Sequence, residues 1–276
     1  MSTRCLTPIH VRHKIKGTWQ EVPCSKCPNC MKRRVSGWSF RLMKEGERSK
    51  SALFVTLTYN TENVPISENG YMTLRKSDLQ KFFKRLRKLS DARLRYYAVG
   101  EYGTNRFRPH YHIILFNADI EQIERAWALD NQKIGDIHCG EVCEASIGYT
   151  LKYVSKPKRI PLHQRDDRIP EFAIMSKKMG DNYITENMIK WHKNDLTNRM
   201  YVPIKDGKKI AMPRYYKEKI YTMAEKKSIF LTMQNIAEQE EQAERIKLGE
   251  KYEQEKLTIV LDEFRKMYKN NKRKDL

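Results

Sequence analysis

The 276-residue chain contains no run of about 18 apolar residues, so it does not encode a membrane-spanning helix. Its first ten residues, MSTRCLTPIH, lack the apolar core of a secretory signal peptide. We therefore expect the protein to remain in the compartment in which it is made. In that setting its six cysteines are better suited to free thiols or metal ligands than to disulfides.

Acidic residues are scarce relative to basic ones, and the imbalance is uneven along the chain. The net charge is +20, from 54 Lys and Arg against 34 Asp and Glu. Residues 1–50 hold 12 basic and 3 acidic residues, whereas residues 217–270 hold 11 of each. A basic surplus concentrated in part of a chain predicts a polyanionic partner, most commonly nucleic acid. A solvated basic surface without a partner is the alternative.

The chain shows no internal repeat and divides into four regions. Residues 1–50 are rich in cysteine and then in basic residues, and residues 51–156 alternate strand and helix patterns. Residues 157–216 contain five prolines and are expected to be rich in loops. Residues 217–276 form a helical C-terminal region, with one long helix expected over 217–270.

The second region predicts the fold. SALFVTLTY (51–59) alternates as a strand does, and Ser77 with Gln80 predicts a capping box that starts a helix. LRYYAVGEYG and HYHIILF predict two further strands, followed by a helix over 119–129, a strand at GDIHCGEV and a helix over 145–156. This order predicts an α+β fold, an antiparallel sheet of the RRM or ferredoxin-like kind with helices packed on one face.

The stretch RFRPHYHIILF (106–116) carries two histidines at alternate positions of a predicted strand. Because side chains at i and i+2 of a strand share a face, His110 and His112 project together. If this strand pairs with the preceding one across the 102–109 loop, Glu101 falls close to His110. Two imidazoles and a carboxylate can hold a divalent metal ion and leave positions open for water or substrate. Histidines that only form hydrogen bonds on a sheet are the alternative.

The helix expected over 145–156 separates apolar residues from tyrosines. At 100° per residue, one face contains Ile147, Leu151 and Val154, and another contains Tyr149 and Tyr153, flanked by Lys152 and Lys156. Nearby cations favour the phenolate, and a divalent metal ion polarises a phosphoryl oxygen. Together these groups can attack a phosphodiester and form a tyrosyl–phosphate bond. Tyrosines that merely cover the edge of a helix are the alternative.

The N-terminal region predicts a second metal site. Cys24, Cys27 and Cys30 form a C-x2-C-x2-C run, with Cys5 as a fourth ligand and His10 or His13 as substitutes. A structural zinc ion is the first expectation. An iron–sulfur cluster also uses this run, but no cysteine follows soon after Cys30, and free thiols are the remaining alternative. Cys139 and Cys143 are expected to be small buried residues.

Several basic and aromatic residues are candidates for contact with nucleic acid. A helix after Cys30 is expected to gather basic side chains, Arg33 and Arg34 among them, along phosphates or in solvent. Arg106 and Arg108 flank the predicted metal site and are better placed to hold a scissile strand. Three tyrosines of the predicted sheet are expected to pack within it, with base stacking as the alternative; they are Tyr96, Tyr97 and Tyr102.

These motifs resemble those of a known family. HYH (110–112) resembles the His-hydrophobe-His motif of HUH endonucleases, FVTLTY their first strand, and YTLKYVSK (149–156) their two-tyrosine motif. PCSKCPNC, GEYG…RPHYH, IMSKKMG and MPRYYKEKIY are similar to segments of the replication initiators of microviruses of the gokushovirus kind. The resemblance covers roughly residues 1–220, and the order and spacing of the motifs make it specific.

The resemblance implies an HUH core and rolling-circle replication. It implies that His110 and His112, with Glu101 as third ligand, hold Mg²⁺ or Mn²⁺. Tyr149 and Tyr153 would be the nucleophiles, and Lys152 and Lys156 would hold the DNA phosphate or the leaving oxygen. The implied partners are single-stranded or supercoiled origin DNA, a host polymerase and a host helicase, all in the host bacterial cytoplasm. A non-catalytic, zinc-containing nucleic-acid-binding protein and an HUH single-strand transposase are the alternative functions.

Overall fold

The computed structural model describes residues 4–12, 17–130, 132–155 and 160–273. They form two compact units, one drawn from Met1–Gly37 and Tyr183–Leu276 and the other from Trp38–Asn182. Helix α1 (Pro28–Arg48) begins in the first unit and ends in the second. None of the helices in the described residues combines the length and the apolar character needed to cross a membrane.

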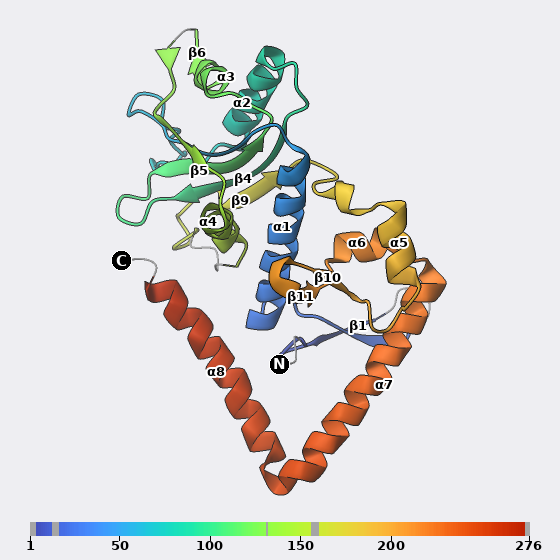
Figure 1. The fold of residues 1–276 in the computed structure, drawn as a ribbon. Helices are drawn as coiled ribbons and strands as arrows, with labels where there is room; N and C mark the ends of the chain where they lie inside the picture. The colour runs from blue at the N-terminus through green and yellow to red at the C-terminus, as the bar shows by residue number, and fades with distance from the viewer. Residues whose placement is uncertain (1–3, 13–16, 131, 156–159, 274–276) are drawn as a thin grey trace. The chain divides into compact units, whose positions relative to one another are not determined.

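The second unit is built on a five-stranded antiparallel sheet (Figure 1). Its strands are β3 (Ala52–Leu57), β4 (Arg95–Tyr102), β5 (Pro109–Phe116), β8 (Ile137–Glu141) and β9 (Phe172–Met175). They pair in the order β8-β3-β5-β4-β9. Numbered along the chain, the first four strands stand in the order 4-1-3-2, as in a ferredoxin-like sheet, and β9 extends the β4 edge. The predicted α+β class with an antiparallel sheet is confirmed.

Helices cover both faces of this sheet. On one face lie α2 (Lys76–Leu89) and α3 (Ile120–Ala126), and four residues of α2 are buried in the core there: Leu79, Phe82, Phe83 and Leu86. On the other face lies α4 (Glu144–Ser155), whose Tyr149 ring contacts His112. Glu45 of α1 also binds Arg95 on that face. The expectation of helices on one face is therefore wrong, because the polar side chains of the second face are also covered.

The tyrosine between the two histidines anchors the start of α2. Tyr111 points to the α2 face, where its hydroxyl accepts a hydrogen bond from the backbone N–H of Arg75 at 3.1 Å and lies 2.7 Å from the Tyr59 hydroxyl. Arg75 is the N-cap residue, and its side chain forms no capping hydrogen bond. The capping box predicted at Ser77 is wrong, because a buried hydroxyl from the sheet satisfies the helix terminus instead.

Short elements fill the stretch that was expected to be rich in loops. Besides β9, it contains α5 (Glu186–Lys193), α6 (Arg214–Ile220) and the paired strands β10 (Tyr201–Pro203) and β11 (Lys209–Ala211), with single 3-10 turns at Asp181–Tyr183 and Lys205–Gly207. A small hairpin, β6 (Ala128–Leu129) and β7 (Gln132–Lys133), follows α3. Elements of two to eight residues span too few repeats of a hydrophobic pattern to be predicted from it.

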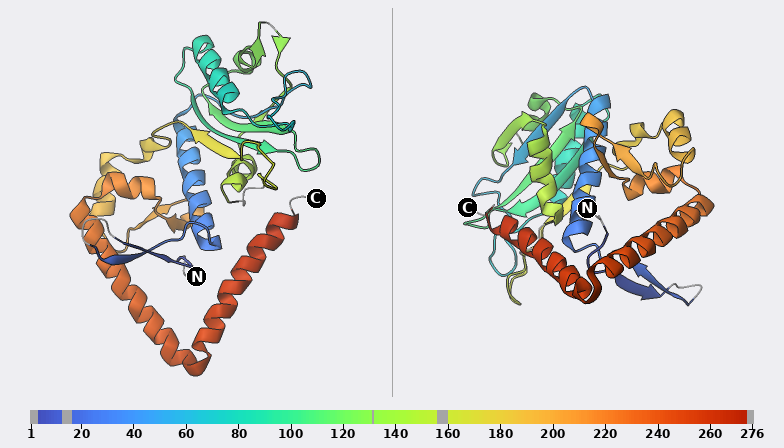
Figure 2. Two further views of the ribbon diagram at one scale, coloured as in Figure 1. Left: turned by 180° about the vertical axis from the view of Figure 1, so that it is seen from behind. Right: turned by 60° about the horizontal axis from the view of Figure 1, so that its bottom comes forward.

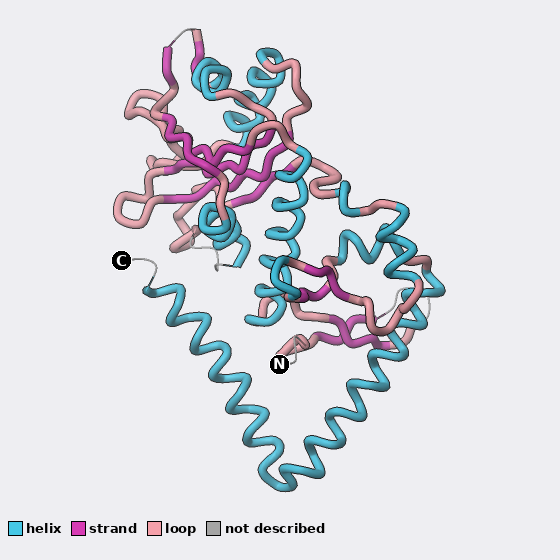
Figure 3. Tube along the Cα trace, in the orientation of Figure 1, coloured by secondary structure: helices cyan, strands magenta, loops and turns pink. Residues whose placement is uncertain are grey.

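The first unit contains a hairpin and two long helices. Strands β1 (Ile9–Arg12) and β2 (Trp19–Val22) pair only with each other among the described residues. Helices α7 (Met223–Leu248) and α8 (Tyr252–Arg273) are separated by a 3-10 turn, Gly249–Lys251, as Figures 2 and 3 show. The single helix expected over 217–270 is therefore wrong. Thr222 and Glu225 form a capping box that starts α7, and Gly249 ends it with a φ of +53°.

Candidate active site

Strand pairing brings Glu101, His110 and His112 together. Glu101 of β4 stands opposite His110 of β5, as expected from the sequence. The Nε2 atoms of His110 and His112 lie 2.7 and 2.9 Å from the same carboxylate oxygen, Oε1 of Glu101. Glu101 is 3% exposed, so this cluster lies at the covered side of the sheet and not on an open surface.

The outer nitrogen of each histidine is already engaged. Nδ1 of His110 donates to the carbonyl oxygen of Arg108 at 3.1 Å, and Nδ1 of His112 lies 2.9 Å from the hydroxyl oxygen of Thr56. A carbonyl only accepts, so His110 carries a proton on Nδ1 and its Nε2 is free to offer a lone pair. Histidines that bind metal ions are oriented by such partners.

The cluster fits a divalent metal ion. The ligand atoms of Glu101, His110 and His112 all lie within 4.8 Å of one another. Oε2 of Glu101 is buried and has no hydrogen-bond partner among the described residues. A carboxylate and two imidazole lone pairs converging on one point require a proton or a cation between them. Two nitrogens and a carboxylate are a donor set that divalent ions accept, with positions left for other ligands.

The charge of Glu101 responds to opposing influences. Burial alone would raise the pKa of this carboxyl, and the hydrogen bonds and charges of His110 and His112 outweigh that effect. The pKa of Glu101 therefore lies below its ordinary value, and the group is a carboxylate at neutral pH. The site thus has a permanent negative charge, which a bound cation would neutralise.

Tyr149 of α4 faces this cluster. Its ring meets the His112 ring edge-on, with centroids 5.0 Å apart, and its hydroxyl points to Oε1 of Glu101 at 3.5 Å. The residue is 42% exposed, so solvent or a substrate can reach it. Ile147 and Leu151 are buried, as predicted for the apolar stripe of this helix.

The surroundings of Tyr149 keep its hydroxyl protonated. Burial and the nearby negative charge of Glu101 raise its pKa to about 12. The sequence-based argument expected nearby cations to act in the opposite direction. The ammonium group of Lys152 does lie over the Tyr149 ring, 5.8 Å from its centroid, but the carboxylate is closer to the hydroxyl. The side chain of Tyr153 and all of Lys156 lie outside the described residues.

Comparisons with known proteins identify the family that carries this site. Residues 52–158, from β3 through α4, match the family model of the replication-associated protein ORF2. Replication-associated protein ORF2 of Spiroplasma virus 4 is 31% identical over 215 residues, which cover 71% of this chain and 66% of that protein. The chain belongs to the replication-associated proteins of microviruses.

Two further phage relatives extend the match. Replication-associated protein VP4 of Bdellovibrio phage phiMH2K is 24% identical over 217 residues, or 71% of this chain and 66% of that protein. Replication-associated protein ORF4 of Chlamydia phage 1 is 24% identical over 244 residues, or 80% and 58%. The chain thus spans slightly less than two thirds of the length of these relatives. No solved structure matches it significantly.

The structure also brings together the four cysteines of the N-terminal region of this replication-associated protein. Cys5, Cys24, Cys27 and Cys30 form one group, whereas His10 is exposed in β1 and His13 lies outside the described residues. Burial would raise the pKa of Cys24, but hydrogen bonds from the Thr7 hydroxyl and two backbone N–H groups lower it to about 6.

The other two cysteines lie in the second unit. Cys139 is half-buried, and Cys143 is exposed in the turn before α4, where its backbone N–H donates to the Ser146 hydroxyl. The prediction that Cys143 is buried is wrong, because its position serves the start of a helix and not the core.

The arginines singled out in the sequence differ in their surroundings. Arg106 is exposed in the loop between β4 and β5, and Arg34 is exposed on α1. Arg108 donates to the carbonyl oxygen of Tyr59 at 2.8 Å, and Arg33 donates to Sγ of Cys30 at 3.4 Å. Arg106 and Arg34 are therefore open to a partner, whereas Arg108 and Arg33 already contact the protein.

Two residues beside the histidines were not predicted. Thr56 lies opposite His112 in the β3–β5 pairing, and Phe54 stacks on the His112 ring with centroids 5.4 Å apart. The alternation of the first strand put Phe54 and Thr56 on one face, but the pairing of β3 with β5 cannot be read from the sequence. Tyr97 and Tyr102 are buried in the sheet, as expected.

Proposed function

We propose that this protein is a nicking and joining enzyme that initiates rolling-circle replication of a circular DNA genome. The observation that carries the proposal is the approach of the Tyr149 hydroxyl to Glu101 and His112, on the only sheet face that α4 covers in the described residues. Its membership of the phage replication-associated proteins supports a role in replication. The net charge of +20 suits a DNA substrate.

The proposed reaction is a transesterification. The phenolic oxygen of Tyr149 forms a bond to a backbone phosphorus of the origin, and the bond from that phosphorus to the 3′ oxygen breaks. The 5′ phosphate remains on the tyrosine, and the phenolic proton is replaced in balance by a proton on the released 3′ hydroxyl. No bond energy is lost to water, so the reverse reaction can rejoin a strand.

Glu101, His110 and His112 would hold a divalent cation for this reaction, Mg²⁺ or Mn²⁺ by our proposal. When bound, it would polarise a phosphoryl oxygen and neutralise the charge that develops in the transition state. Thr56 and the Arg108 carbonyl would keep the two imidazoles oriented. Lys152 would pair with the phosphate.

Tyr153 is proposed as the second nucleophile, one helical turn beyond Tyr149 in α4, with Lys156 as its neighbouring cation. It would cleave the regenerated origin while Tyr149 still carries DNA, and rejoining would release a circle. The released 3′ hydroxyl would serve a host polymerase, and a host helicase would open the duplex. These partners imply that the protein acts in the host bacterial cytoplasm.

The proposal is tested with single-stranded oligonucleotides that tile the genome encoding the protein, incubated with Mn²⁺. We expect a protein–DNA adduct that resists denaturation. It should carry the label of 3′-labelled oligonucleotides, because the tyrosine keeps the 5′ phosphate, while 5′-labelled ones give a shorter free product. Mass spectrometry of the adducted peptide then identifies the tyrosine.

Conservative variants provide the controls. Tyr149→Phe with Tyr153→Phe should abolish the adduct, whereas Tyr268→Phe, the same change at an exposed tyrosine of α8, should leave it intact. An adduct that persists in the double variant contradicts the assignment. Absence of cleavage with every divalent metal, together with unimpaired DNA binding by His110→Ala, would favour a non-catalytic zinc-containing binder. Cleavage of paired hairpin ends by a dimer would favour a single-strand transposase.

A further inference from the structure

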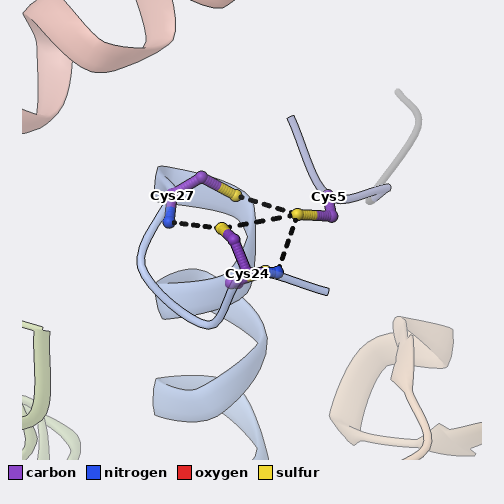
Figure 4. A group of neighbouring side chains, drawn as sticks. Cys5, Cys24 and Cys27 are labelled. Carbon is purple, nitrogen blue, oxygen red and sulfur yellow. Dashed lines mark hydrogen bonds between the residues drawn. The ribbon is translucent and has the colours of Figure 1, made fainter. Parts of the chain in front are cut away.

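Four cysteines far apart in the sequence meet at one point of the first unit. Cys5 precedes β1 and Cys24 follows β2, whereas Cys27 precedes α1 and Cys30 lies in its first turn. All four Sγ atoms lie within 4.8 Å of one another. Figure 4 shows three of them, with Sγ of Cys5 at 3.5 Å from Cys24 and 3.8 Å from Cys27.

These separations match ligands of one ion. A tetrahedral zinc site has Zn–S bonds of about 2.3 Å, which places neighbouring sulfurs about 3.8 Å apart. A disulfide brings two sulfurs to about 2.0 Å, and all four cysteines are free thiols. The thiolates of a four-iron cluster bind different irons and therefore stand farther apart than the edge of one tetrahedron.

Polar hydrogens point at the sulfurs. The backbone N–H groups of Cys24 and Cys27 donate to Sγ of Cys5 and Cys24, each at 3.2 Å, and that of Leu6 donates to Cys27 at 3.4 Å. The Thr7 hydroxyl donates to Cys24 at 3.3 Å. The guanidinium of Arg33 reaches Cys30 at 3.4 Å. Such donors stabilise thiolates that ligate a metal ion, and buried small thiols have no need of them.

The hairpin between Cys5 and Cys24 lacks another means of support. Among the described residues, β1 and β2 pair with no other strand, and seven of their eight residues are exposed. Trp19 is 68% exposed, so apolar burial does not hold the hairpin. An isolated two-stranded hairpin is only marginally stable in water. A clamp at its base would supply what packing does not.

We propose that Cys5, Cys24, Cys27 and Cys30 bind one structural zinc ion that fastens the base of the β1–β2 hairpin to the start of α1. The site is closed, because four thiolates complete a tetrahedron and leave no position for a substrate. It is separate from the Glu101 cluster in both residues and donor type. Its role is to fix an exposed, basic arm of the chain, and it does not depend on the proposed nicking reaction.

The first test measures metal in the purified full-length protein by elemental analysis. We expect one equivalent of zinc that Cys24→Ser removes and that Cys143→Ser, the same change at an exposed cysteine outside the cluster, retains. The double variant His110→Ala, His112→Ala should also retain it. That result would assign the zinc to the cysteines whatever the fate of the nicking activity. Zinc that disappears with the histidines and survives Cys24→Ser would overturn the proposal.

The second test needs no variant and therefore does not depend on the folding of Cys24→Ser. A thiol reagent applied to the native protein should react rapidly with Cys139 and Cys143 alone, and with all six cysteines after a chelator has removed zinc. Chelation should also speed cleavage by trypsin after Arg12 in the hairpin. Six rapidly reacting thiols in metal-free native protein, or iron with labile sulfide in place of zinc, would overturn the proposal.

Discussion

At the scale of single residues, the behaviour of the candidate site depends on which nitrogen of each histidine holds a proton. The Arg108 carbonyl fixes the proton of His110 on Nδ1 and leaves Nε2 toward Glu101. For His112 the same task falls to the Thr56 hydroxyl, which lies 2.9 Å from Nδ1. Thr56 is therefore a positioning residue, since it touches neither the metal nor the DNA in the proposed reaction.

We expect Thr56→Val to weaken Mn²⁺ binding about ten- to hundredfold, the range for loss of an orienting partner. Valine keeps the shape of threonine and removes the hydroxyl, so His112 loses the group that selects its tautomer. Mn²⁺ titration followed by electron paramagnetic resonance measures the affinity, and raising the Mn²⁺ concentration should restore adduct formation.

Thr58→Val is the matched control for Thr56→Val. Thr58 follows β3 on the same face, and its hydroxyl bonds to the backbone of Asp136 and to neither histidine. We expect it to bind Mn²⁺ as the wild type does. Equal affinities in all three proteins would show that the Thr56 hydroxyl does not orient His112.

At the scale of elements, α5 ends in a buried histidine that titrates near neutral pH. Nδ1 of His192 donates to the Arg199 carbonyl at 2.8 Å, so Nε2 accepts from the Tyr183 hydroxyl at 2.9 Å. Burial, together with the charge of Arg199, lowers the pKa of His192 below its ordinary value of 6.5. The folded protein thus binds this proton less readily than the unfolded chain.

The free energy of unfolding should consequently fall as the pH drops below about 6.5. His192 is neutral in both states above that pH and contributes no pH dependence there. Below it the unfolded chain takes up the proton first, which lowers the stability by at most about 1.4 kcal/mol per pH unit until the folded form is also protonated. Urea unfolding between pH 5 and pH 7.5 measures this loss.

Two histidine variants isolate the contribution of His192. His192→Gln should lower stability overall but flatten its dependence on pH in this window. His138→Gln, at an exposed position of β8, should reproduce the wild-type curve. Curves of the same slope for His192→Gln and the wild type would exclude His192 as the source.

Elements with a sustained hydrophobic pattern could be predicted from the sequence, and elements held by distant contacts could not. The strands and helices from β3 to α4 lie where their periodicities indicate, and the β4–β5 hairpin alone brought Glu101 to His110. The start of α2 depends on Tyr111, a residue that is 36 positions from Arg75 and invisible to local rules. Thr56 escaped notice for the same reason, since β3 and β5 are not consecutive strands.

At the scale of the whole molecule, the charge separates binding from chemistry. A net charge of +20 attracts any nucleic acid through its phosphates, whatever the histidines and tyrosines do. Affinity for single-stranded DNA should therefore fall steeply with salt, by a logarithmic slope of about −0.7 for each phosphate neutralised. His110→Ala should leave this slope unchanged while adduct formation is lost.

Arg106→Ala should change the slope instead of the chemistry. Its side chain is exposed in the loop that joins β4 to β5 just beyond the paired Glu101 and His110, so a strand that reaches the site would pass it. We expect the slope to become shallower by about 0.7, the loss of one phosphate contact, in fluorescence anisotropy titrations with EDTA present. Arg265→Ala, which removes an equally exposed charge from α8, controls for the change in net charge. If both variants shift the slope equally, the effect belongs to the overall field of the protein, and Arg106 makes no contact of its own.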